Sequence, residues 1–234
     1  MPWAFCVRPG RYPAAMQRML LLGVSVALGL LGCATSTVQK TVVDQYGLTI
    51  KLRSQAKPFG EATPRGFEQP AVIPAPQLAL ILGGVEVDQR PDANSPVFER
   101  RPAIPSKILG EVSEGLAQAF AEASPDQEIV VLALRKELQH GVFHRKFLTS
   151  FVTYLKNDQL YLFFSRVEWP VDKKRASDRL PEPSPNDRVM NITTVGNAVY
   201  EKAGAQGVRV DWRRPEFGLD TVAASPGGED EDAD

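Results

Sequence analysis

The chain has 234 residues, of which 43% are hydrophobic and 24% are charged, so it has enough apolar material for one folded domain. Its 27 basic and 28 acidic residues nearly cancel, which excludes the strongly basic surface typical of nucleic-acid-binding proteins. Only two cysteines are present, Cys6 and Cys33, too few for a disulfide framework or a cysteine-based metal site.

The N-terminal region contains an apolar run at residues 19–31 that follows Arg18 and ends in Leu30-Leu31-Gly32-Cys33. The run has about 13 residues, whereas a membrane-spanning helix needs ~20. The motif resembles the lipobox that ends the signal peptide of bacterial lipoproteins, although Leu31 is bulkier than the usual residue at its position. An ordinary secretory signal and a transmembrane helix are the alternatives. The first residues make an unusual leader, so translation starting at Met16 or Met19 is a further option.

The resemblance implies that residues 1–32 are removed and that acyl chains are attached to Cys33. The protein would then be membrane-anchored on the periplasmic side, and Ala34, which is not Asp, favours the outer over the inner membrane. Residues 33–37 form a short tether that reaches only ~14 Å past the anchor. A single domain is expected at 38–222, followed by a disordered acidic tail at 223–234.

Hydrophobic periodicity predicts a sheet-rich domain. Alternating or continuous apolar runs, typical of strands, occur in chain order at 38–53 (two short strands), 85–88, 129–134, 143–155, 160–169 and 208–212. The continuous run at 129–134 indicates a strand buried on both faces. Residues 156–158 are expected to form the turn of an antiparallel hairpin.

The clearest helix is predicted from about Lys107 to Ala123, because apolar residues recur there at three- and four-residue spacing. Ser106 is its expected N-cap and Pro125 ends it. Residues 77–82 fit a short helix or strand, and 197–203 fit a short helix. The fold class predicted from these elements is α+β, a mainly antiparallel sheet with the 107–123 helix packed on it and long proline-rich loops at 54–76, 89–105 and 172–187.

No catalytic or metal-binding pattern is found in the sequence. His140 and His144 are the only histidines, and in an extended chain residues four apart are separated by ~13 Å, too far to share a metal ion. There is no nucleophile elbow and no phosphate-binding loop. The sequence therefore predicts no cofactor and no enzyme.

Two groups of basic residues are candidate interaction sites. Arg135, Lys136, Arg145 and Lys146 form the first, which is expected to face either an anionic membrane or a protein partner, and residues 173–175 form the second. Solvated strand ends and loops are the alternative explanation for both. Trp169 and Trp212, each at a strand end, fit either interface anchors or packing at the edge of the core.

Three functions remain open at this point. The first is a non-enzymatic envelope lipoprotein that is an accessory or assembly component of a membrane-associated complex, with an envelope protein as partner. The second is a small-ligand or lipid binder with a cleft between the 107–123 helix and the sheet. The third is a cell-wall hydrolase, which would need two carboxylates in one pocket.

Overall fold

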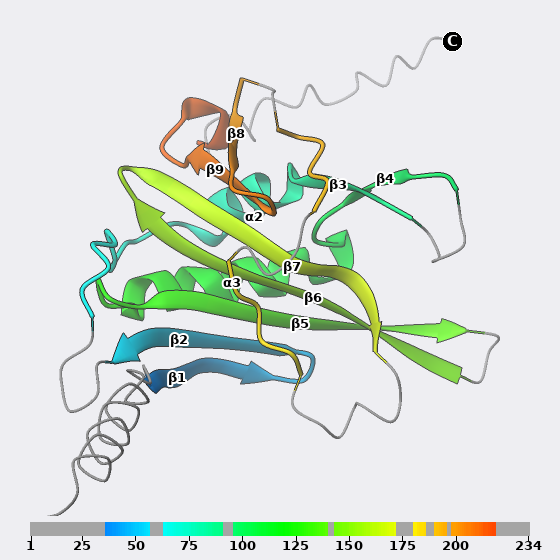
Figure 1. Cartoon of the computed structure of the whole chain (residues 1–234), viewed down its shortest axis with the longest axis horizontal. Coiled ribbons are helices and arrows are strands. Elements are labelled where there is room, and N and C mark those ends of the chain that lie inside the picture. Colours follow the sequence, from blue (N-terminus) through cyan, green and yellow to red (C-terminus); the bar gives the residue numbers. More distant parts are fainter. Residues whose placement is uncertain are drawn as a thin grey trace, which may run out of the picture.

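The computed structural model describes residues 36–56, 63–90, 96–139, 143–171, 180–185, 190–195 and 198–218. Within these ranges the chain forms a seven-stranded sheet of order β1-β2-β5-β6-β7-β9-β8 in which all neighbours are antiparallel (Figure 1). The strands are β1 (Ser36–Gln45), β2 (Leu48–Ala56), β5 (Glu128–Gln139), β6 (Phe143–Lys156), β7 (Gln159–Val171), β8 (Tyr200–Ala203) and β9 (Gly207–Asp211). A second, two-stranded sheet pairs β3 (Glu86–Gln89) with β4 (Glu99–Pro102).

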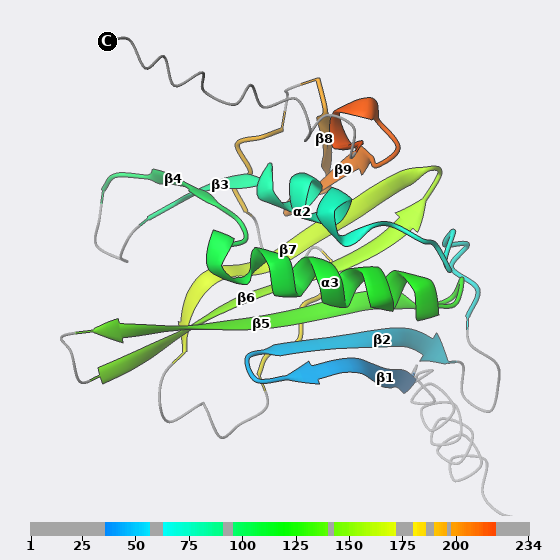
Figure 2. The same ribbon diagram turned by 180° about the vertical axis from the view of Figure 1, so that it is seen from behind.

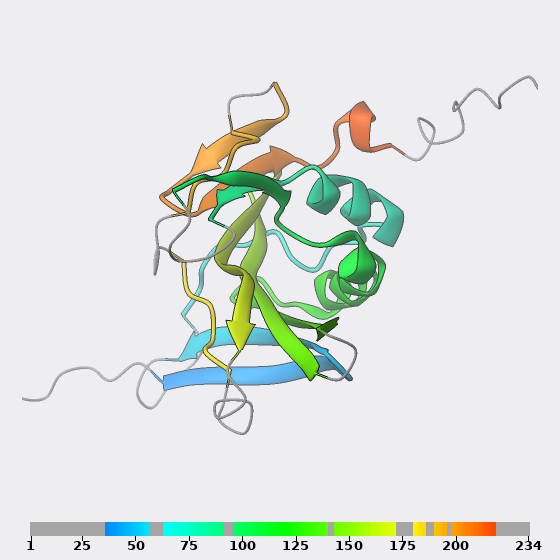
Figure 3. The ribbon, with the colours of Figure 1, turned by 90° about the vertical axis from the view of Figure 1, so that its right-hand side faces the viewer.

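Two helices cover one face of the large sheet, α2 (Ala75–Gly83) and α3 (Ser106–Glu122) (Figure 2). The opposite face is crossed by residues 180–185, which form no regular structure (Figure 3). The predicted fold class, an α+β domain dominated by an antiparallel sheet with the 107–123 helix packed on it, is confirmed.

The main core lies between the helices and the sheet. Alternate residues of β2 point into it, so that Leu48, Ile50 and Leu52 are almost completely buried, as their alternation with polar residues predicts. In β5 both faces are covered, because Ile129 packs in the main core while Leu132 joins a smaller cluster beneath Leu180. The apolar run at 129–134 is therefore continuous because the strand is buried on both faces, as predicted from the sequence.

Several elements differ from the expectations. Residues 99–102 form a strand, β4, within the predicted loop, and 200–203 are a strand, β8, although a helix was predicted. Short runs such as these carry no clear period, and their pairing with β3 and β9 decides their conformation. The predicted N-cap is also wrong, because Ser106 is already helical and Pro105, which has no side-chain donor or acceptor, occupies the cap position. Residues 77–82 lie within helix α2.

The predicted turn at 156–158 is confirmed and is a tight two-residue hairpin. Asn157 and Asp158 both have positive φ, 53° and 58°, and Lys156 pairs with Gln159 across the turn. Positive φ at both central residues is the signature of the type I′ turn, whose twist matches that of the flanking strands.

Residues 63–73 of the first proline-rich loop are packed along the domain and do not form a free loop. Their backbone amides at Phe67, Glu68 and Ala71 donate to carbonyls of other elements over 2.9–3.0 Å. The Phe67 ring stacks on Tyr154 of β6 with centroids 4.4 Å apart. These contacts hold an irregular segment against the sheet, which explains how a run rich in proline remains ordered.

Two glycines of α3 should respond in opposite ways to replacement by alanine. A Cβ at Gly110 would meet nothing within 4 Å, so Gly110→Ala should raise the free energy of unfolding by about 1 kcal/mol through helix propensity. A Cβ at Gly115 would lie 2.7 Å from the Ile50 Cδ1 atom, so Gly115→Ala should gain nothing or lose stability. Chemical denaturation of the two variants beside the wild type measures the difference. Equal stabilisation by both would contradict the close packing of α3 on β2.

Candidate functional site

The residues of the predicted lipidation motif, Leu30, Leu31, Gly32 and Cys33, lie outside the described residues, as do the acidic tail at 223–234 and the basic residues 173–175. The first described residue, Ser36, already belongs to β1, so the sheet begins two residues before the predicted domain start at 38. In the sequence, only Ala34 and Thr35 separate Cys33 from this strand.

All four residues of the predicted basic cluster lie on one projecting hairpin. Strand β2 follows β5 only to Ala133, and β7 follows β6 only to Lys146, while β5 and β6 pair onward to Gln139 and Phe143. We call residues 135–139 and 143–147 the arm. It extends beyond Leu48, the first residue of β2, at the end of the sheet opposite to the start of β1 (Figure 1).

Within the arm, Arg135 has a different role from the other three basic residues. It pairs with Glu168 of β7, and its Nη1 atom lies 3.1 Å from Glu137. The hydrogen-bonded Glu168 carboxylate raises the pKa of Arg135. The guanidinium also lies over the Phe147 ring, 4.8 Å from its centroid. Arg135 thus connects the base of the arm to β7. Its positive charge is already compensated by Glu168 and is not available to a binding partner.

The remaining cations of the arm differ from Arg135. No described carboxylate forms an ion pair with Lys136, Arg145 or Lys146, although Glu137 is the cross-strand neighbour of Arg145; Lys136 and Arg145 are exposed. Lys136 and Lys146 face each other as a cross-strand pair, so their like charges lie on the same face of the arm. The lysine pair, which no described carboxylate contacts, gives this end of a nearly neutral chain a local excess of positive charge that favours contact with an anionic surface.

A recess lies where the arm leaves the body of the sheet. We call it the notch; it measures about 290 Å³ and is lined by Tyr46, Gly47, Lys107, Ile108, Leu134, Arg135, Lys136 and Lys146. The Lys136 Nζ atom lies 4.0 Å from the centroid of the Tyr46 ring, which is 82% exposed. The lining of the notch therefore combines three lysines with two apolar residues, Ile108, which packs against the main core, and Leu134, which packs against the Leu132 cluster.

Gly47 closes one side of the notch and cannot be replaced without strain. Its φ is +95°, and a Cβ would lie 2.9 Å from the Leu134 carbonyl oxygen. The Gly47 carbonyl accepts the backbone N–H of Leu134 over 2.6 Å. The sequence alone gives no means of placing this glycine beside β5, because the register between strands far apart in the chain is set by tertiary packing.

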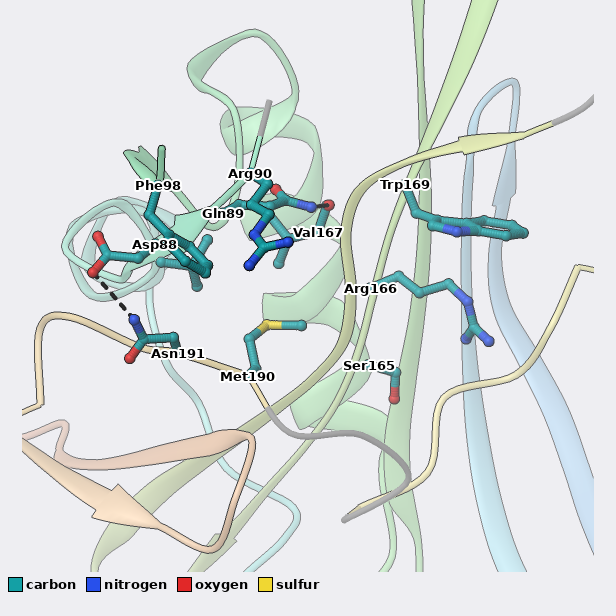
Figure 4. Close-up of a pocket in the computed structure, with 11 residues that line it drawn as sticks. Asp88, Gln89, Arg90, Phe98, Ser165, Arg166, Val167, Trp169, Met190 and Asn191 are labelled. Carbon is teal, nitrogen blue, oxygen red and sulfur yellow. Dashed lines mark hydrogen bonds between the residues drawn. The ribbon is translucent and has the colours of Figure 1, made fainter. Parts of the chain in front are cut away.

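A second cavity, of about 340 Å³, lies between the β3–β4 sheet, β7 and residues 190–191 (Figure 4). Gln89 donates to the Val167 carbonyl over 2.8 Å, whereas its buried Oε1 atom has no hydrogen-bond partner among the described residues. Figure 4 shows Arg166 and Trp169 directed to the other side of β7 from Phe98. Sequence reasoning missed this cavity because its walls come from four separate segments.

The interface between α3 and the sheet, where a ligand cleft was considered, is filled by side chains such as Leu116, Phe120 and Ile129, each 0% exposed. The cavity of Figure 4 includes a single described carboxylate, that of Asp88, whereas glycoside hydrolysis needs two. The two tryptophans pack at core edges, Trp169 against the cluster of Leu132 and Trp212 against the main core.

Neither histidine contributes to a metal site in the described part of the chain. His144 is an exposed strand residue of the arm, and His140 lies outside the described residues. No group of three or more His, Cys, Asp or Glu side chains in the described ranges is arranged to hold a metal ion. Among the same residues, no helix has the length and apolar character needed to cross a membrane.

Comparison with known proteins gives no relative: no family model, no curated protein and no solved structure matches the chain. The function must therefore be argued from the residues themselves.

Proposed function

We propose that this protein is a bacterial envelope lipoprotein, anchored through acylated Cys33, that acts as a non-enzymatic accessory or assembly component of a membrane-associated complex. It would face the periplasm from the outer membrane, as Ala34 suggests. The observation that carries the proposal is the lipobox at residues 30–33, followed after two residues by the first strand of a sheet.

The position of the sheet supports a role close to the membrane. With Cys33 in the bilayer, two residues of tether keep the start of β1 within about 10 Å of the lipid surface. The ten residues of β1 span ~30 Å, and the arm lies beyond their far end. An upright domain would present the arm away from the bilayer, so a protein partner is favoured over lipid headgroups as its target.

The lipid anchor is tested by metabolic labelling of cells with a fatty-acid analogue. We expect the wild type to carry the label and to fractionate with membranes, and Cys33→Ser to lose both properties. Cys6→Ser is the matched control, because the other cysteine lies within the predicted signal peptide and should not affect labelling. A labelled Cys33→Ser variant, or an unlabelled wild type, would contradict the anchor.

The assembly role is tested by crosslinking in living cells, followed by purification of wild type and Cys33→Ser. A discrete envelope protein that is captured by the anchored form alone would support the role. A wild type that is anchored but captures no specific protein would contradict it and favour ligand binding.

The alternative function, binding of a small ligand or lipid, is favoured by the 340 Å³ cavity and by the Gln89 Oε1 atom, which accepts no hydrogen bond from a described residue. A bound molecule should then be released when purified protein is denatured and examined by mass spectrometry. Met190→Trp, which places a large ring in the cavity, should abolish that signal. A wild type that releases no small molecule would contradict this alternative.

A further inference from the structure

Strand β5 has an open edge beyond the notch. The backbone N–H of Leu134 points toward the β1–β2 turn, where Gly47 accepts it. Because alternate residues of a strand direct their backbone groups to the same side, those of Lys136 and Leu138 face the same edge. No described strand pairs with β5 on that side past Ala133. Within the described part of the chain, no strand continues β2 along this edge.

The surroundings of this edge suit an extended peptide. The notch forms a corner between the β1–β2 turn, the start of α3 and the arm, and its lining includes the apolar residues Ile108 and Leu134. Leu138, further along the arm, is 56% exposed. Strand addition uses backbone hydrogen bonds for affinity and alternate side-chain sites for specificity, and both elements are present here.

The charges select the partner. Lys107, Lys136 and Lys146 line the notch and pair with no carboxylate of the described residues. A second copy of the chain, paired arm to arm, would bring like charges together, which is a common protection of edge strands against self-association. An acidic segment would instead compensate them.

We propose that the notch and the open edge of β5 bind an extended, acidic segment of a protein partner, which adds as a strand along Lys136 and Leu138, beyond the Leu134 N–H that Gly47 already accepts. This inference rests on the proposed assembly role and specifies its binding surface and the chemistry of its partner. The acidic residues of the segment would lie near Lys136 and Lys146, and an apolar side chain would enter the corner over Ile108 and Leu134.

Site-specific photocrosslinking of the full chain in cells tests the proposal. A photoreactive benzoylphenylalanine replaces Leu138 in one variant and Val38 in a second, matched control variant. The two side chains are almost equally exposed, 56% and 55%, but Val38 lies near the start of β1, at the end of the sheet opposite to the arm. We expect crosslinking at Leu138 alone, to a segment of another protein that mass spectrometry shows to be rich in Asp and Glu.

The charge requirement is tested with Lys136→Glu combined with Lys146→Glu. Because these residues are cross-strand neighbours, the double variant exchanges one like-charge pair for another and should leave the fold unchanged. Crosslinking at Leu138 should fall roughly tenfold, since charge complementarity at an interface sets encounter and register. Lys202→Glu on β8 is the control and should have no effect.

Each other outcome would overturn the inference. Attachment to residues 219–234 would make the tail of the chain itself the ligand, attachment to a second arm would indicate a dimer, and attachment to phospholipid would indicate a membrane surface. A segment without acidic residues, or no attachment at Leu138, would contradict strand addition at this edge. Labelling of Cys33 with the fatty-acid analogue tests the lipid anchor in a separate experiment. Failure of the anchor is therefore distinguishable from failure of strand addition at the arm.

Discussion

Replacing Glu128 by alanine should lower the free energy of unfolding by about 3 kcal/mol, because it leaves two largely buried arginines without their common partner. The Glu128 side chain is 4% exposed and lies 2.6 Å from both Arg53 Nη2 and Arg65 Nη1. Arg53 belongs to β2, whereas Arg65 belongs to the irregular segment that packs along the sheet. The carboxylate therefore stabilises two elements at once.

Chemical denaturation measures this loss, and two controls define its cause. Glu128→Gln keeps the shape and hydrogen-bonding oxygen of the side chain and should lose less. Glu182→Ala removes a second, weaker partner of Arg53: this carboxylate is 36% exposed and lies 3.3 Å from Lys51 and 3.9 Å from Arg53, so its cost should stay below about 1 kcal/mol. A loss below 1 kcal/mol for Glu128→Ala would show that the arginines find other partners, such as the Pro183 carbonyl that Arg53 already contacts.

The second large effect concerns stability at alkaline pH. Burial raises the pKa of Tyr200 to about 12, and its hydroxyl donates to the Ile81 carbonyl of α2 over 2.8 Å. In the unfolded chain the hydroxyl ionises at the ordinary value of 10.0, whereas the folded protein keeps it protonated. Between these values the unfolded state binds fewer protons, so stability must fall as pH rises.

We expect the contribution of Tyr200 to the free energy of unfolding to stay constant below pH 10. Between pH 10 and pH 12 it should fall by about 2 kcal/mol. Tyr200→Phe should lower the free energy of unfolding by about 1 kcal/mol at neutral pH, because the hydrogen bond is lost. Above pH 10 the free energy of unfolding of this variant should fall less steeply with pH than that of the wild type. Burial raises the pKa of Tyr154 as well, so some alkaline dependence will remain in the variant. Denaturation curves from pH 8 to 12 give both slopes, and parallel slopes would contradict the assignment to Tyr200.

The success of the sequence reasoning depended on the length and period of each element. Strands β2, β5, β6 and β7 and helix α3 were predicted because long alternating, continuous or helical patterns require burial on defined faces. Strands β4 and β8 have four residues each, which is too short for a period to be recognised. The lipobox at residues 30–33 remains a prediction from sequence, since it lies outside the described residues.

The candidate site could be predicted only in part. The sequence brought Arg135 and Lys136 together with Arg145 and Lys146, because a hairpin joins neighbouring strands. The sequence did not distinguish Arg135 from the other three basic residues, because its ion-pair partner, Glu168, lies on β7. Glu168 has a φ of 47° and lies where the pairing of β7 with β6 is irregular. Nor did it place Tyr46 and Lys107 beside the arm, which depends on contacts between distant segments.

By itself, the sequence determined the class of fold and a specific prediction of membrane attachment, because periodicity and short linear motifs are local properties of a chain. Only the tertiary structure decided that the basic residues lie on an arm at the far end of the sheet from Ser36, and that no described strand pairs with the edge of β5 beside three lysines. Strand order and register arise from the packing of side chains distant in sequence, so the surface proposed for the partner becomes visible only when the sheet has been assembled.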